Sequence, residues 1–95
     1  MHFTIFQMPI SIWHKDHIIF TADTPVRLEN YNAVWQDTLP DNEHRDEMRV
    51  LEIIFERFNL NHPMNYARRS ISAGDIVKLN DNYYLCCTIG WTKIE

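Results

Sequence analysis

The chain has 95 residues, a formal net charge of -4, and a composition that is 45% hydrophobic and 13% aromatic. This length supports one domain, residues 1–95, and the apolar content is too high for a disordered chain. The chain also lacks the concentrated basic patch that general nucleic-acid binding needs, so no direct contact with nucleic acid is expected.

The distribution of apolar residues and cysteines bears on the compartment. No apolar run reaches the roughly 18 residues needed to cross a bilayer, and the opening residues lack the basic start of a signal peptide. The two cysteines, Cys86 and Cys87, are adjacent, and neighbours on a strand point to opposite faces, so a bridge between them would be strained. We therefore expect two reduced thiols in a cytoplasmic protein that makes no membrane contact.

The first half of the chain predicts three strands. Residues 2–8 partly alternate and are apolar on much of both faces, and Pro9 ends this strand or marks a sheet edge. Residues 17–22 are rich in branched and aromatic side chains, and residues 31–39 alternate again. An exposed edge at residues 2–8 could pair two copies into a homodimer.

An amphipathic helix over about residues 43–58 is the clearest element. Its apolar stripe follows helical spacing and consists of Met48, Leu51, Ile54, Phe55 and Phe58. Asp41 or Asn42 is the expected N-cap, and Asn59, Asn61 and Pro63 supply the stop.

The last third of the chain, residues 74–94, predicts three short strands. Asn80, Asp81 and Asn82 tolerate left-handed turn geometry and predict a tight hairpin, and Gly90 predicts a second corner. Strands, then a helix, then strands indicate an α+β domain. We expect a small antiparallel, partly barrel-like sheet packed on the one main helix.

Residue types that support catalysis or metal binding are present without a supporting context. His14 and His17 could ligate a metal, but a third ligand is missing nearby, so no metal and no cofactor are expected. Cys86 or Cys87 could act as a nucleophile beside a histidine such as His62, but a cysteine on a strand usually serves packing. We therefore predict no catalytic residues.

Acidic residues are concentrated in the first half. Residues 16–47 hold eight acids and two arginines, a net charge of -6. Such carboxylates could imitate a phosphate array and occupy a basic channel in a nucleic-acid-binding protein. The predicted partner-binding acids are Glu29, Asp37, Asp41, Glu43, Asp46 and Glu47.

Aromatic residues exceed what one small core can hold. Core placement accounts for about half of them, and tryptophans and tyrosines left at a surface favour protein contacts. The residues concerned are Trp13, Tyr31, Trp35, Tyr83, Tyr84 and Trp91. Trp13 and Trp35 are the predicted anchors of the partner interface.

Residues 51–91, "LEIIFERFNLNHPMNYARRSISAGDIVKLNDNYYLCCTIGW", resemble the YodL-like domain family, whose small uncharacterised proteins occur in Firmicutes genomes and mobile elements. The family pattern includes "IFERFN", a His or Arg before Pro, a segment close to "SLSVGDIV", a "YY" hairpin and a closing glycine-aromatic pair. This chain departs from it at Tyr66 and Ala67, where Phe and Gly are common, and at Cys87, where an acid is common. The signature residues, which we expect to be structural, are Asn61, His62, Arg68, Arg69, Gly74 and Asp75.

The resemblance implies a fold neighbourhood and a mobile-element setting but no established reaction. Together with the acidity it predicts a stoichiometric inhibitor of a host defence nuclease, of anti-CRISPR or anti-restriction type, which acts by occlusion. Two alternatives stay open. One is a housekeeping regulatory or adaptor protein related to the cell envelope or cell shape. The other is a hydrolytic or RNA-processing enzyme that uses His62 with Arg68 or Arg69.

Overall fold

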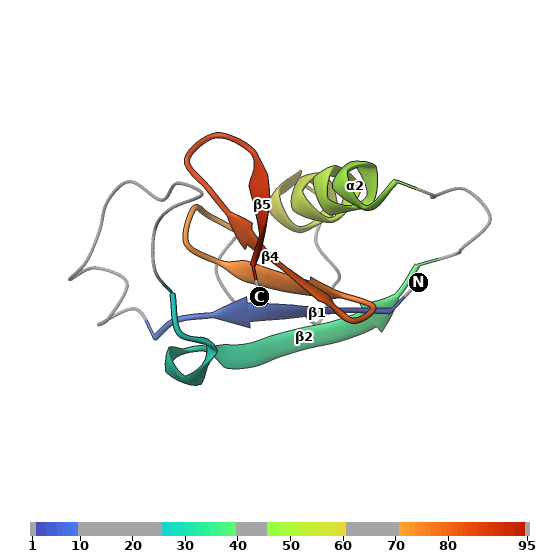
Figure 1. The fold of residues 1–95 in the computed structure, drawn as a ribbon. Coiled ribbons are helices and arrows are strands. Elements are labelled where there is room, and N and C mark those ends of the chain that lie inside the picture. Colours follow the sequence, from blue (N-terminus) through green and yellow to red (C-terminus); the bar gives the residue numbers. More distant parts are fainter. Residues whose placement is uncertain (1, 10–25, 40–45, 61–70, 95) are drawn as a thin grey trace.

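The computed structural model describes residues 2–9, 26–39, 46–60 and 71–94 (Figure 1). Its sheet consists of five strands: β1 (His2–Gln7), β2 (Asn32–Thr38), β3 (Ile76–Leu79), β4 (Asn82–Cys86) and β5 (Trp91–Ile94). A 3-10 turn, η1 (Leu28–Asn30), precedes β2, and one α-helix, α2 (Glu47–Leu60), lies between β2 and β3 in these ranges. The predicted strand at residues 17–22 falls outside the described residues.

The sheet order is β2-β1-β3-β4-β5, and every neighbouring pair is antiparallel. The described residues therefore confirm the predicted α+β class, because they contain one helix and an antiparallel sheet. The partly barrel-like closure is wrong, because β2 and β5 remain two separate edges of an open sheet. The expected edge at residues 2–8 is also wrong, since β1 lies between β2 and β3 and its backbone is paired on both sides.

The two predicted corners after the helix are confirmed. Leu79 pairs with Asn82, so Asn80 and Asp81 form a two-residue hairpin turn, and Asn80 takes the positive φ of 54° that asparagine tolerates. Gly90, with φ 76°, precedes β5. A positive φ strains residues that carry a Cβ, which explains glycine at the second corner.

The helix begins later than the predicted residue 43, and its N-cap differs from the predicted one. Asp46 Oδ1 accepts a hydrogen bond from the Met48 N–H at 3.0 Å, and the Asp46 carbonyl accepts the Val50 N–H at 3.1 Å. Asp46 is therefore the N-cap, in place of Asp41 or Asn42, because its carboxylate satisfies a donor of the first turn. Residues 43–45 lie outside the described ranges.

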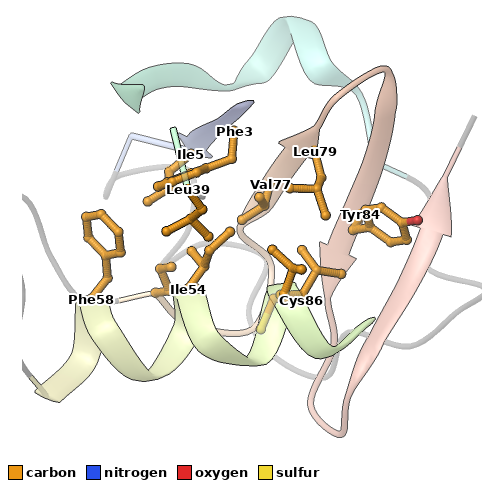
Figure 2. Packing of buried hydrophobic residues seen from close by; sticks show 12 residues of the cluster. Phe3, Ile5, Leu39, Ile54, Phe58, Val77, Leu79, Tyr84 and Cys86 are labelled. Atoms are coloured by element: carbon orange, nitrogen blue, oxygen red, sulfur yellow. The ribbon is translucent and has the colours of Figure 1, made fainter. Parts of the chain in front are cut away.

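The main core lies between α2 and one face of the sheet. Figure 2 shows the helix directing Ile54 and Phe58 toward strand residues such as Ile5 and Val77. The fully buried side chains of this cluster include Phe3, Val50, Leu51 and Leu79. Because strand neighbours alternate, Ile76 and Leu85 belong to a second cluster, with Met8, Tyr31 and Cys87.

The buried stripe of the helix is displaced from the predicted one. Val50, Leu51, Ile54 and Phe58 are buried, whereas Met48 and Phe55 are 41% and 36% exposed. The helical period was correct, but its centre was misplaced by about one residue position, since Val50 replaces Met48 at the core. This displacement puts the aromatic ring of Phe55 on the surface, where it becomes part of the candidate site.

Candidate functional site

A groove opens between α2 and β5, and we call it the α2–β5 groove. The helix contributes Glu52 and Phe55, and β5 contributes Trp91. The end of β4 supplies Cys86, and the segment that joins β4 to β5 supplies the remaining described lining residues, which are Cys87, Thr88 and Gly90. Its volume is about 180 Å³, and Figure 1 shows β5 lying beside α2.

Two aromatic rings form adjacent walls of this groove. The ring centroids of Phe55 and Trp91 are 6.4 Å apart, and their planes meet at 88°. Ile89, between the lining residues Thr88 and Gly90, is 92% exposed. The groove thus has a part-exposed aromatic pair next to an exposed aliphatic side chain. Such a combination is more frequent at surfaces that bind a partner than on the rest of a protein surface.

The thiols that line the groove are poor nucleophiles. Burial, then the charge of Asp75, then the neighbouring Cys87 raise the pKa of the Cys86 thiol from 9.0 to about 12. Burial also raises the pKa of Cys87. Both cysteines are free, and each sulfur lies near a backbone carbonyl, Cys86 Sγ at 3.9 Å from that of Cys87 and Cys87 Sγ at 3.7 Å from that of Leu85. A thiolate is needed for nucleophilic attack, so this environment favours the packing interpretation of both residues.

The signature residues Gly74 and Asp75 form a tight turn that is tied to β1. The Asp75 N–H donates to the Ser72 carbonyl at 3.0 Å, and Asp75 Oδ2 accepts the Ser72 N–H at 2.9 Å. Gly74 has φ 98°, the geometry that favours glycine at the third position of a type II turn. Gln7 Nε2 donates to the same Asp75 oxygen at 3.1 Å, so the buried carboxylate joins this turn to the central strand.

A second tie holds the same segment to the helix and to the loop before β2. Asn59 Oδ1 accepts the Ile71 N–H at 2.7 Å, and Asn59 Nδ2 donates to the Ile71 carbonyl at 3.0 Å. The Tyr31 hydroxyl donates to the Gly74 carbonyl at 2.5 Å. Sequence reasoning treated Asn59 only as a helix stop, although its place within "IFERFN" was a signal that its side chain has a specific partner.

The described acids of the predicted partner surface are mostly engaged in local structure. Asp46 caps the helix, and Glu47 accepts hydrogen bonds from Asn82 and from the Tyr84 hydroxyl. Asp37 accepts from the Thr38 N–H at 2.8 Å and from Trp35 Nε1 at 3.4 Å. Glu29 lies 3.5 Å from Arg27, and both side chains are more than 70% exposed.

These acids do not form one patch. Glu29 belongs to η1, before β2, whereas Asp37 near the end of β2 lies toward the same end of the molecule as the start of α2 (Figure 1). Asp46 and Glu47 stand at that start. The remaining predicted site residues lie outside the described ranges: Trp13, Asp41, Glu43, Asn61, His62, Arg68 and Arg69. His14 and His17 of the metal hypothesis lie there as well.

Five of the six aromatic residues considered as a surface surplus, about half of which were expected in the core, lie in the described ranges. Tyr31 and Tyr84 are buried, and Trp35, Tyr83 and Trp91 are half-buried. The ring of Trp35 lies 6.1 Å from that of Phe58, at 65°, against the main core. The exposed aromatic side chain in the described part of the chain is instead Phe55.

In the described residues, these features define a small α+β domain in which one helix packs on an open five-stranded sheet. Hydrogen bonds from residues of the signature sequence join the helix, the turn before β3 and the sheet. The chain belongs to the YodL-like domain family, whose model matches residues 7–95. It is also 32% identical over 79 residues to the uncharacterized protein R785 of Acanthamoeba polyphaga mimivirus, an alignment covering 70% of this chain and 71% of the viral protein. No solved structure matches this chain.

Two further observations apply to the described residues. None of their helices is both long and apolar enough to cross a membrane. No group of three or more His, Cys, Asp or Glu side chains among them is arranged to hold a metal ion.

Proposed function

We propose that this protein acts by stoichiometric binding to another protein through the α2–β5 groove. The observation that carries the proposal is the exposure of Phe55 beside Trp91 in the groove, together with the exposed Ile89 between two residues that line it. Large apolar side chains that remain exposed at a groove are favoured at protein interfaces, where aromatic anchors supply much of the binding energy. The raised pKa of both thiols in the same groove favours binding over covalent chemistry there.

The proposed partner is a host defence nuclease of CRISPR or restriction type, which the bound protein occludes. A net charge of -4 favours approach to a channel that normally holds nucleic acid, since opposite charge speeds and directs association. A relative encoded by a virus supports a role that such a genetic element can use against its host. In this proposal the acids steer the complex and the groove anchors it.

An interference assay tests this function. A host with an active CRISPR or restriction system is transformed with a targeted plasmid, with and without this protein, and transformation efficiency is measured. We expect the protein to restore transformation, and Phe55→Ser with Ile89→Ser to abolish that effect. Leu60→Ser is the matched control, because Leu60 is 79% exposed but does not line the groove. Undiminished interference from every system tested, with an envelope or cell-shape protein bound instead, would favour the adaptor alternative.

The proposed role of the acidic residues in association requires a separate set of variants. Charge reversal at Asp46 or Glu47 would remove the helix cap or the hydrogen bonds to Asn82 and Tyr84, so a loss of binding there could reflect lost folding. Reversal of Glu29, which is exposed, together with Asp41 and Glu43, is the cleaner test. We expect slower association with the nuclease at low salt and a smaller difference at high salt. Equal association rates for both proteins at low salt would contradict electrostatic steering.

A further inference from the structure

We propose that the α2–β5 groove binds the guanidinium group of an arginine side chain that the partner protein presents. This inference rests on the proposed function, which supplies a protein partner, and adds the chemistry by which the groove recognises it. The inference depends on three properties of the groove: its charge, its aromatic walls and its size.

The groove carries a single negative charge among its described lining residues. Glu52 is exposed on α2, and within the described part of the chain its carboxylate has no hydrogen-bond or ion-pair partner. The other described lining residues are apolar or neutral, because both thiols keep their protons at neutral pH. A cation is therefore the complementary ligand, and an anion would meet both this carboxylate and the net negative charge of the chain.

The aromatic walls favour an organic cation over a metal ion or an aliphatic side chain. The faces of Trp and Phe rings attract cations, and both Phe55 and Trp91, which contact each other edge to face, line the groove. The same sheet already uses this interaction, since Lys78 Nζ lies 5.5 Å from the centre of the Tyr83 ring. Arginine suits the groove better than lysine, because its planar, weakly hydrated guanidinium can stack on a ring while it donates two hydrogen bonds to a carboxylate.

The size of the groove fits one side chain. Its volume of about 180 Å³ is smaller than the roughly 300 to 1,000 Å³ of sites that enclose a whole small-molecule ligand. A guanidinium with part of its aliphatic stem requires less. Ile89, 92% exposed beside the groove, is placed to contact the partner residues that flank the inserted arginine.

The cations of this chain that the structure describes do not already fill the site. Arg49 and Arg57 line a different pocket, on the outer face of α2 with Ile53, Glu56 and Leu60. Arg27 lies against Glu29, and Lys78 over Tyr83. Lys93 on β5 makes no ion pair with Glu52.

A titration followed by amide NMR tests the inference directly. The probe is N-acetyl-arginine-N-methylamide, and the comparison ligand is the citrulline analogue, which has nearly the same shape without the charge. We expect saturable shifts at Phe55 and at residues 88–91, with the citrulline analogue binding about fivefold more weakly. Glu52→Gln should lower the affinity for the arginine probe by a similar factor. Glu56→Gln, which removes an equal charge one helical turn further along, should leave the affinity within about twofold.

Several outcomes would overturn the inference. Equal affinity for the two ligands would show that charge is not recognised, and shifts confined to another surface would place the site elsewhere. Equal behaviour of Glu52→Gln and Glu56→Gln would remove the role of the groove carboxylate. Phe55→Leu gives a second check, because it keeps an apolar side chain at an exposed position and should still reduce arginine binding about threefold. Unchanged amide spectra away from the groove would verify that these variants are folded.

The partner complex separates this inference from the proposed function. If wild type forms a one-to-one complex with the nuclease and Glu52→Gln forms it equally well, the arginine site is wrong and the proposed function stands. If wild type forms no complex with any protein, the proposed function fails, whereas the probe titration still decides what the groove recognises. We expect Glu52→Gln and Phe55→Leu each to weaken the complex, and Glu56→Gln to leave it unchanged.

Discussion

Asn59, in the last turn of α2, binds the backbone of Ile71 through both ends of its carboxamide. The side chain replaces the neighbouring strand that would otherwise satisfy the N–H and the carbonyl of Ile71, a fully buried core residue. The helix end is thereby fixed to the start of the turn that leads into β3. This relationship, between residues 12 positions apart, links the two signature segments "IFERFN" and "SISAGDIV".

Removing this carboxamide should destabilise the fold. We expect Asn59→Ala to lower the free energy of unfolding by about 2 kcal/mol, because two hydrogen bonds are lost and a part-buried backbone pair is left without its partner. Asn59→Asp should be similarly damaging at neutral pH, since a carboxylate would face the Ile71 carbonyl oxygen. Urea unfolding is the measurement, and Glu56→Ala on the exposed face is the control. If Asn59→Ala lowered the free energy of unfolding no more than the control does, the two hydrogen bonds of Asn59 would contribute nothing to stability.

The contact between Tyr84 and Glu47 should make stability depend on pH in the alkaline range. Burial, then the hydrogen bond to Glu47 and the charges of Glu47 and Asp46, raise the pKa of Tyr84 from 10.0 to about 12. The folded state therefore holds this proton more tightly than the unfolded state. The resulting stability is present below pH 10 and is lost as the pH rises from 10 to 12.

Tyr84→Phe is the variant that isolates this effect. We expect the unfolding free energy of wild type to fall more steeply between pH 10 and pH 12 than that of Tyr84→Phe, measured by urea titration at each pH. The comparison is needed because Cys86 also titrates in this range. Parallel pH profiles for the two proteins would contradict the raised pKa of Tyr84.

The two thiols should react slowly in the native protein. A pKa raised from 9.0 to about 12 reduces the thiolate fraction of Cys86 by about a thousandfold at pH 8, so alkylation by iodoacetamide should be slower by a comparable factor. Cys87 should also be slowed, by less. Mass spectrometry over time distinguishes the two after digestion. Rapid labelling in buffer, at the rate seen in urea, would show that the β4–β5 corner opens readily.

Local sequence signals predicted the elements better than their tertiary neighbours. Asn80 and Gly90 correctly predicted the turns in which they lie, because the ability to adopt a positive φ depends on the residue type alone. Pro9 was expected either to end the first strand or to mark a sheet edge. β1 does end two residues before it, at Gln7, but β1 is central, because strand order depends on the pairing of β1 with segments 25 or more residues away. The open sheet was missed for the same reason, since closure is decided by strand number and tilt and leaves no local mark.

The candidate site was harder to predict than the fold. Periodicity identifies a helix face that spans three to four residues per two turns, and a shift of one position moved Phe55 from core to surface. Charge counting marked Asp46 and Glu47 as partner residues, whereas their positions at the helix start give them a cap and a cross-link to β4. Only the three-dimensional placement of β5 next to α2 brings Trp91 to Glu52 and Phe55.

Substitutions of Gly90 measure how much a strained backbone conformation at the groove lowers the free energy of unfolding. A Cβ at this position would meet nothing within 4 Å, so Gly90→Ala adds no clash, and its φ of 76° is the remaining penalty. We expect Gly90→Ala to reduce the free energy of unfolding by about 1 kcal/mol. Gly90→Asn should cost less despite its larger side chain, because asparagine tolerates this conformation. A greater loss for Asn than for Ala in urea unfolding would indicate steric crowding instead.

Phe58 and Phe55 test whether the two faces of α2 have the roles assigned to them. Phe58 is fully buried, and its ring lies 6.0 Å from that of Phe3, at 78°. We expect Phe58→Ala to cost about 3 to 5 kcal/mol, which is enough to unfold much of a domain of this size. Phe55→Ala, which removes the same atoms from a part-exposed position, should cost about 1 kcal/mol and spare the fold. Thermal unfolding by circular dichroism compares the two. A large loss from Phe55→Ala would mean that the aromatic pair with Trp91 is a core contact, and the groove would then be part of the interior rather than a surface available to a partner.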